Sequence, residues 1–363
     1  MMINIKSTEE KSMIGINDSN MYREIHDQHR HVADCLRLNA DMMKKIAKEV
    51  KERNIKSVVL VGRGSSDHAN LVGRYAFEMY TDMVATIAAP SVVTMYNGKV
   101  DYSNSLVIGI SQCGQAQDVY EVLKRCDDQG GIAVSITNVR DCLMATLKEY
   151  YMNCECGEEK SFTACKSYLT QMTILLGLVA EISGDASLKE ALEKAPSVIE
   201  KCYEVEDQVR AILPMYRNAN QVYLYGRGLL NALANEAELK IIESAYLDAR
   251  CYGSSDFYHG PISMTPRFMP NIFYVADTLT NQSTMDLHNK LRSEKQLYTT
   301  VVTNVKEYAE MADHSVVLPE ECDGILGVYG CAIFSQLFAC LLAIERGYNP
   351  DFPVGLSKVT VTR

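Results

Sequence analysis

Two short segments place serine hydroxyls next to a glycine, which is the composition that a phosphate-binding turn needs. They are Gly64-Ser65-Ser66-Asp67 and Ser111-Gln112-Cys113-Gly114-Gln115. Each follows an apolar run and precedes residues with helical spacing. Hydroxyls and free backbone N–H groups there could surround a phosphate through hydrogen bonds worth roughly 1.5–3 kcal/mol each. Either segment alone could be an ordinary helix N-cap. Because both occur in one half of the chain, we predict a phosphate site.

The pair Gly62 and Gly64 also resembles the start of the dinucleotide fingerprint G-x-G-x-x-G. The third glycine is absent, because Asp67 holds its position and Asn231 holds it in a second copy of the segment. No GxxxxGK[ST] run occurs in the sequence, which disfavours ATP binding. We therefore expect no nucleotide and no other cofactor.

The first of these turns belongs to an internal repeat. The sequence SVVLVGRG at 57–64 recurs as QVYLYGRG at 221–228. In both copies a short run of β-branched or aromatic residues ends in Gly-Arg-Gly and leads into helical spacing, which predicts a strand, a turn and a helix. A repeat of this length predicts two similar domains.

Further apolar runs predict additional buried strands. They lie at residues 105–110, 131–136, 272–276, 298–303 and 315–317, and most are followed by stretches with helical spacing. Alternation of this kind predicts an α/β fold with helices on both faces of a parallel sheet. We expect two doubly wound, flavodoxin-like three-layer α/β/α domains in tandem, with ligands bound beyond the carboxyl ends of the strands.

The domain limits follow from interruptions of these patterns. Residues 21–53 indicate one or two amphipathic helices before the first repeat, and Gly, Ser and Pro punctuate residues 184–197. Gly347 and Asn349-Pro350 should end the last helix. We predict a lead-in at 1–21, a first domain with its N-terminal helices and phosphate site at 22–195, a second domain at 196–345, and a C-terminal tail at 346–363 that reaches the active site.

Composition excludes several classes of protein. Among the 363 residues, 47% are apolar and 23% are charged, as in ordinary soluble globular proteins. The net charge is −10 without a compensating stripe of Lys and Arg, which argues against nucleic-acid binding. The apolar stretches at 167–182 and 331–344 are shorter than about 18 residues and contain Gln171 and Gln336, so we expect buried helices and no membrane span.

The cysteines indicate a reducing compartment. None of the 12 forms a CxxC pair, and the closest spacing, Cys154-x-Cys156, lacks the second pair of ligands that a structural zinc site needs. No signal peptide is recognisable at the start of the sequence. We expect reduced thiols, no metal and a cytoplasmic location.

Four motifs resemble the sugar isomerase (SIS) domain family: GSSDH at 64–68, SQCG at 111–114, EEKSFTACK at 158–166 and HGP at 259–261. The resemblance extends over about residues 22–363. It is strongest to the isomerase half of glutamine:fructose-6-phosphate amidotransferase and to relatives without the glutaminase domain. Those relatives are SIS-type glucosamine-6-phosphate deaminases and deglycases of phosphorylated Amadori products. RGSSDH at 63–68 with APSV at 89–92 is most similar to the deaminases.

The resemblance implies that a sugar 6-phosphate is bound by four groups with Ser65 beside them: Ser66, Ser111, Gln112 and the Cys113 backbone. Two positions depart from the family pattern, because Cys113 replaces a serine and Ala116 replaces a serine or threonine. Gln115 is the candidate to compensate. Further candidates for substrate binding are Gly64, His68, Glu159 and Lys240.

The resemblance also implies three catalytic residues. Glu243 would move the proton between C1 and C2, and His259, lent by a neighbouring subunit of a homodimer, would open the sugar ring. Lys358 in the tail would meet the carbonyl, although Val354 stands where the family has an arginine. A 1,2 proton shift does need a carboxylate base and a second proton-transfer group. Without the resemblance, Glu243 and Lys358 could be ordinary exposed residues.

Three functions remain open. No glutaminase segment precedes the repeat and no cysteine follows Met1, so we do not expect glutamine-dependent synthesis. The first hypothesis is a deaminase/isomerase that converts glucosamine 6-phosphate, through an enolamine, to a ketose 6-phosphate and ammonia. The second is a deglycase of fructosamine 6-phosphates such as fructoselysine 6-phosphate, which needs the same residues. The third is a sugar-phosphate-binding regulator without catalysis.

Overall fold

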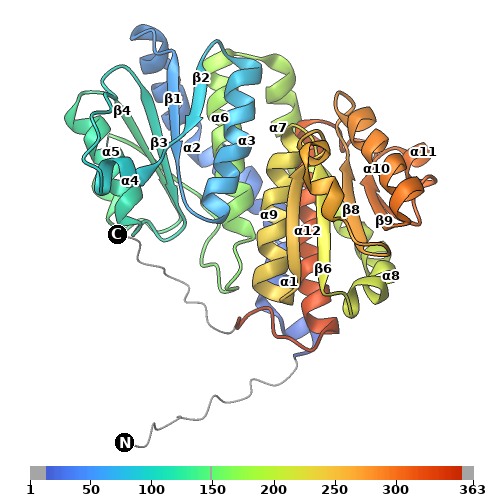
Figure 1. Ribbon diagram of the computed structural model, residues 1–363. Coiled ribbons are helices and arrows are strands. Elements are labelled where there is room, and N and C mark those ends of the chain that lie inside the picture. The colour runs from blue at the N-terminus through green and yellow to red at the C-terminus, as the bar shows by residue number, and fades with distance from the viewer. Residues whose placement is uncertain (1–13, 148, 354–363) are drawn as a thin grey trace, which may run out of the picture.

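The computed structural model describes residues 14–147 and 149–353, and it contains two five-stranded parallel sheets with helices around them (Figure 1). The first sheet has the order β2-β1-β3-β4-β5 and the second has the order β10-β9-β8-β6-β7. When the strands of each sheet are numbered 1 to 5 in chain order, both sheets have the spatial order 2-1-3-4-5. This is the flavodoxin-like topology. The predicted fold class of two tandem α/β domains is therefore confirmed.

The strands of the first sheet are β1 (Ser57–Val61), β2 (Val84–Ile87), β3 (Leu106–Ser111), β4 (Ile132–Thr137) and β5 (Tyr150–Asn153). Those of the second are β6 (Gln221–Gly226), β7 (Asp248–Gly253), β8 (Pro270–Val275), β9 (Tyr298–Thr303) and β10 (His314–Val317). Central strands such as β3 and β4 are buried along their whole length, as both-face coverage of a parallel sheet requires.

The helices are α1 (Asn20–Ile25), α2 (Gln28–Glu52), α3 (Ser65–Tyr80), α4 (Pro90–Thr94), α5 (Gln117–Asp128), α6 (Lys166–Ser183), α7 (Ala186–Cys202), α8 (Glu206–Arg217), α9 (Leu229–Ala245), α10 (Asn281–Lys295), α11 (Lys306–Ala309) and α12 (Ile325–Glu345). Short 3₁₀ turns are η1 (Ile16–Asp18), η2 (Met144–Thr146), η3 (Tyr203–Val205), η4 (Asp256–His259) and η5 (Pro261–Met264). The two predicted N-terminal helices are α1 and α2.

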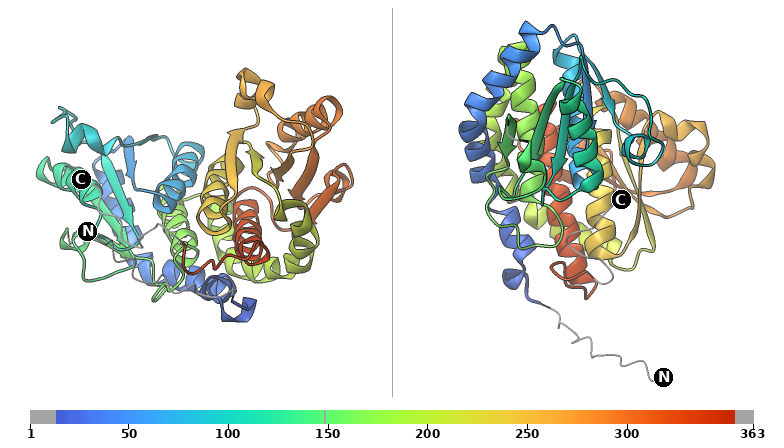
Figure 2. Two further views of the ribbon diagram at one scale, coloured as in Figure 1. Left: turned by 60° about the horizontal axis from the view of Figure 1, so that its bottom comes forward. Right: turned by 90° about the vertical axis from the view of Figure 1, so that its left-hand side faces the viewer.

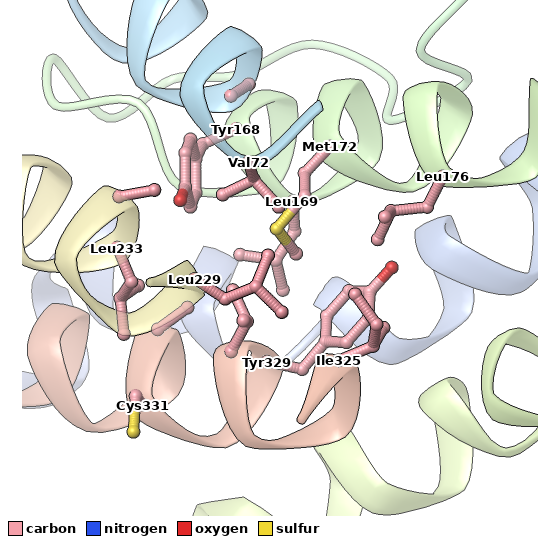
Figure 3. Packing of buried hydrophobic residues seen from close by; sticks show 14 of the residues in the cluster. Val72, Tyr168, Leu169, Met172, Leu176, Leu229, Leu233, Ile325, Tyr329 and Cys331 are labelled. Atoms are coloured by element: carbon pink, nitrogen blue, oxygen red, sulfur yellow. The ribbon is translucent and has the colours of Figure 1, made fainter. Parts of the chain in front are cut away.

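One hydrophobic core joins the two domains. Helices α3, α6, α9 and α12 lie between the two sheets (Figures 1 and 2). Their apolar side chains form a single buried cluster with the inner faces of both sheets. Figure 3 shows Leu169 and Met172 of α6 packed near Leu229 and Leu233 of α9. The Thr173 hydroxyl also lies 2.7 Å from the Tyr329 hydroxyl of α12, so the domains are held together by packing and by a buried hydrogen bond.

Separate clusters fill the outer face of each sheet. Alternate residues of β1 divide between the faces: Val58 and Leu60 join the shared core, whereas Val59 and Val61 pack toward α5. In the second domain the outer cluster is aromatic, with Tyr223, Tyr225 and Phe273 beneath α10.

The C-terminal helix α12 is a core helix, although the sequence-based argument from its length was wrong. It runs for 21 residues and is long and apolar enough to cross a membrane by length and composition alone. Its most apolar 18-residue window is fully buried within the protein. It is burial against α7, α8 and α9 that identifies its role.

The chain between the domains is helical. Gly184 ends α6 in a left-handed conformation, but Pro196 lies inside α7, which continues from Ala186 to Cys202. The Gly, Ser and Pro residues between 184 and 197 therefore mark a single turn and not an irregular linker. After α12, the Asp351 carboxylate accepts hydrogen bonds from the backbone N–H groups of Asn20 (2.6 Å) and Met21 (2.9 Å), which ties the start of the tail to α1.

Candidate active site

The two predicted phosphate turns meet at one edge of the first sheet. β1 and β3 are hydrogen-bonded neighbours, and the chain leaves their carboxyl ends in opposite directions, toward β2 and toward β4. This is the switch point at which doubly wound sheets bind ligands. Gly64, before α3, adopts φ +55° and ψ −132°, and Gly228, before α9, adopts nearly the same angles, φ +61° and ψ −128°. The repeated Gly-Arg-Gly sequence thus has a conformational reason, since a residue with a side chain is strained there.

A cavity of about 220 Å³ lies over this switch point. The described residues that line it come from the two turns, from the segment before α6, from α6 itself and from α9. They are Arg63, Ser65, Ser66, Ile110, Ser111, Gln112, Cys113, Ala116, Phe162, Ala164, Ser167, Gln171 and Glu243. Five predicted phosphate-site residues and the predicted base therefore share one cavity, and only Glu243 is supplied by the second domain.

The Ser111 turn is shaped by Gly114. The backbone N–H of Gly114 donates to the Ser111 hydroxyl at 3.2 Å, and Gly114 has a φ of +66°. A Cβ at this position would lie 2.2 Å from the Cys142 sulfur, so no other residue fits. The Cys113 thiol lies 3.8 Å from the Ser111 hydroxyl, and Cys113 lines the cavity with sulfur where the family pattern has a hydroxyl.

Arg63 contributes a positive charge that the sequence analysis did not assign to the site. Its Nε and Nη2 atoms donate to Asp118 Oδ2 at 2.8 and 2.6 Å, and the residue lines the cavity beside the serines. The ion pair with the buried Asp118 holds the guanidinium at the rim. A cation in this place favours an anionic ligand.

Behind the cavity lies a buried ionic network on α9. Lys240 is almost fully buried, and its Nζ lies 3.0 Å from Glu243 Oε2, 3.2 Å from Glu236 Oε1 and 2.9 Å from the Ser65 hydroxyl. Glu236, Lys240 and Glu243 are spaced i, i+4 and i+7 along α9, so all three lie on one face of the helix. Lys240 therefore links the first phosphate turn to the predicted base.

The charges in this network are stabilised mutually. Burial alone would raise the pKa of Glu236, but the Lys240 charge and the His68 hydrogen bond outweigh it and hold that pKa below its ordinary value. Burial would likewise lower the pKa of Lys240, and the carboxylates of Glu236 and Glu243 outweigh it and raise the pKa. The network is thus built as an ammonium between two carboxylates.

The remaining predicted residues lie elsewhere among the described part of the chain. Gly64 and the exposed Gln115 adjoin the turns without lining the cavity. Glu159 is buried, and its carboxylate accepts hydrogen bonds from Cys165 N at 2.9 Å and from the Ser167 hydroxyl at 2.6 Å, so it shapes the segment that carries Phe162 and Ala164.

Of the two other predicted catalytic residues, the structure describes His259, which lies apart from Glu243. His259 is exposed on η4 and does not line the cavity. Lys358 lies outside the described residues. The prediction that His259 acts on a neighbouring subunit's site requires this separation but is not tested by it.

The second domain has a carboxylate near its own switch point. In the turn after β8, Asp277 Oδ2 accepts a hydrogen bond from the Thr280 hydroxyl at 2.8 Å. Asp323 binds the Thr278 backbone N–H at 2.7 Å in the same region. Two carboxylates here disfavour a phosphate, so the predicted phosphate site stays with the turns of the first domain.

Comparison with known proteins identifies a family domain in the first half of the chain. Residues 46–180 match the family model of the SIS domain, and this segment contains the five strands of the first sheet and the two predicted phosphate turns. Across most of its length the chain is also similar to a group of aminotransferases.

Two of these relatives are glutamine–fructose-6-phosphate aminotransferases (isomerizing). That of Sulfurisphaera tokodaii is 29% identical over 346 residues, covering 94% of this chain and 56% of the relative. That of Thermococcus kodakarensis is 26% identical over 353 residues, covering 94% of this chain and 58% of the relative. The chain thus spans a little more than half the length of these curated relatives.

Solved structures share the fold of the whole chain. The C-terminal domain of glucosamine-fructose-6-phosphate aminotransferase from Francisella tularensis has a TM-score of 0.80 at 21% identity, covering 93% of this chain and 98% of that one. Glucosamine-6-phosphate deaminase from Thermotoga maritima has a TM-score of 0.73 at 20% identity, covering 95% of this chain and 100% of that one. At these identities the likeness establishes the tandem fold.

Proposed function

We propose that the protein is an amino-sugar phosphate isomerase/deaminase that acts on glucosamine 6-phosphate or a close relative. One observation carries this proposal: the Ser111 turn and the Glu243 carboxylate line the same cavity of about 220 Å³. A 6-phosphate bound at the turn would hold the sugar between the first domain and the base on α9. The similarity to aminotransferases named for fructose 6-phosphate supports a phosphorylated sugar as substrate.

In the proposed reaction, the sugar ring opens and Glu243 removes the proton from C2 to give an enolamine. The same carboxylate returns the proton to C1, which leaves an imine at C2. Water then hydrolyses the imine to fructose 6-phosphate and ammonia. Placement of one carboxylate within reach of both carbons is what a 1,2 proton shift requires.

The proposal includes a homodimer. His259 lies on the exposed η4, apart from the cavity of its own chain. We infer that a second copy brings this imidazole to the site, where it transfers the proton of ring opening, and that Lys358 meets the open-chain carbonyl.

The test is a coupled assay for ammonia released from glucosamine 6-phosphate at enzyme concentrations near micromolar. We expect release by the wild type and none by Glu243→Gln, which keeps the shape of the side chain without the base. Absence of ammonia release by the wild type contradicts the deaminase. Release of a free amino acid and glucose 6-phosphate from fructoselysine 6-phosphate would instead identify a deglycase, in which the nitrogen is on C1. Binding without turnover on either substrate would indicate a regulator.

A further inference from the structure

His68 forms a contact between the domains next to the site. It lies one turn after Ser65 on α3, and its Nδ1 is 2.8 Å from Glu236 Oε2 on α9. A carboxylate can only accept, so Nδ1 carries the hydrogen and donates it. Among the described residues, those lining the cavity do not include His68. The imidazole therefore contacts Glu236 behind the cavity and does not line the cavity itself.

The carboxylate that His68 contacts supports the base indirectly. Glu236 is buried, with 3% of its side chain exposed, and its other oxygen lies 3.2 Å from Lys240 Nζ. An ammonium has three N–H donors. Lys240 donates hydrogen bonds to Glu243 and to the Ser65 hydroxyl, and it forms an ion pair with Glu236. Its position is therefore determined by all three, and a shift of Glu236 changes the place at which Lys240 holds Glu243.

Loss of the imidazole would upset this balance. A buried carboxylate deprived of one donor must find compensation elsewhere. The nearest cation is Lys240, so Glu236 would draw the ammonium toward itself and away from Glu243 and Ser65.

We propose that His68 is a positioning residue, which orients the base Glu243 through Glu236 and Lys240. This inference rests on the proposed function, because it takes Glu243 as the base. It replaces the direct substrate contact that the sequence suggested for His68. It also gives the domain interface a part in the reaction, since His68 and Ser65 belong to one domain and the charged residues to the other.

The test compares kcat and KM of His68→Leu and His68→Asn with the wild type, on the phosphorylated amino sugar that the wild type turns over. For His68→Leu we expect a fall in kcat of about 10- to 100-fold with KM changed by less than about twofold, as for a misplaced group. Asn can place its amide nitrogen near the position of Nδ1, so His68→Asn should recover most of kcat. His31→Leu is the matched control, because His31 also pairs with a carboxylate, Asp27 at 3.1 Å, but lies on α2.

A double-mutant cycle with Glu236→Gln separates positioning from direct contact. If His68 acts through Glu236, the double variant loses no more activity than the more impaired single variant. Multiplied losses, a raised KM at unchanged kcat, or wild-type kinetics of His68→Leu would overturn the proposal. Thermal unfolding identifies a variant that does not fold, in which case His68→Ala replaces His68→Leu in the cycle. A wild type that turns over none of the sugars defeats the proposed function before any variant is compared, and the inference with it.

Discussion

The carboxylate of Glu243 and the hydroxyl of Ser111 lie in different domains. A different type of secondary structure positions each of them at the cavity. Ser111 is the last residue of β3, where the sheet itself delivers it to the switch point. Glu243 lies in the last turn of α9, on a helix face whose other members, Glu236 and Lys240, are buried. The proposed base is therefore held by charge, and the proposed phosphate anchor is held by backbone geometry.

Removal of the Ser111 hydroxyl should weaken substrate binding more than it slows the catalytic step. For Ser111→Ala we expect KM for the phosphorylated sugar to rise about 10- to 100-fold, since a hydrogen bond to a charged group contributes roughly 1.5–3 kcal/mol. kcat should change little. Steady-state kinetics measure both, and the exposed Ser103→Ala serves as control. An unchanged KM would place the phosphate elsewhere.

The buried Glu236 should make stability depend on acid pH. Its pKa is lowered in the folded protein from an ordinary value of 4.5, because Lys240 and His68 outweigh the effect of burial. The folded state thus binds fewer protons, so this stabilisation is present above about pH 4.5 and is lost as the pH falls through the folded pKa. Urea unfolding at pH 7 and pH 4 should show a smaller loss of unfolding free energy in Glu236→Gln than in the wild type. Equal losses in the two proteins would show that Glu236 is not the group responsible, and exposed Glu193→Gln provides the baseline.

The sequence predicted the candidate site residues that lie in recognisable motifs. It did not predict those that line the cavity because of tertiary packing. The serines and Glu243 stood in recognisable motifs. Arg63 lay in the repeat, but its direction toward the cavity depends on Asp118, 55 residues away. Gln171 appears in the sequence only as a polar interruption of an apolar helix. It lines the cavity because α6 turns that face toward β3, which depends on tertiary contacts.

At the level of elements, the strands predicted from the sequence include every central strand of both sheets and one edge strand, β10. The three that it did not predict, β2, β5 and β7, all lie at sheet edges. β2 alternates between exposed and buried residues, and β7 contains Asp248 and Arg250, so neither has a continuous apolar run. Edge strands are stabilised by pairing with a neighbour, and that partner is not visible in a local window.

The Gly114 turn allows strain and crowding to be separated. Gly114 and Gly157 have φ angles of +66° and +63°, but a Cβ on Gly114 would meet Cys142 whereas one on Gly157 would meet no atom within 4 Å. Both alanine variants incur the left-handed penalty of about 1–2 kcal/mol. Gly114→Ala should cost about a further 1–3 kcal/mol for overpacking and should also impair phosphate binding. Chemical denaturation tests this difference, and equal unfolding free energies would contradict the geometry of the turn.

At the level of the whole molecule, the two domains share their largest core. Neither could be separated along 195/196, because α7 continues through that position and packs on both α2 and α12. The sequence repeat predicted two similar domains, and the two sheets do share one topology. It could not predict that their helices would form one common layer, since this depends on which faces meet.

The shared core should make unfolding cooperative. Leu233 on α9 is fully buried in the cluster shown in Figure 3, so Leu233→Ala should cost about 2–5 kcal/mol. The exposed Leu38→Ala should cost less than about 0.5 kcal/mol. Far-UV and near-UV circular dichroism in urea should report a single transition in both variants. Two separated transitions in the wild type would show that the domains unfold independently.

The central claim is that Glu243 moves a proton on a sugar whose phosphate is held at the Ser111 turn. Incorporation of deuterium from D₂O into C1 of fructose 6-phosphate, measured by NMR, isolates this step because exchange needs ring opening and proton abstraction but no loss of nitrogen. We expect exchange by the wild type, none by Glu243→Gln, and exchange by Ser111→Ala only at raised substrate concentration. Exchange by Glu243→Gln at the wild-type rate would contradict the central claim.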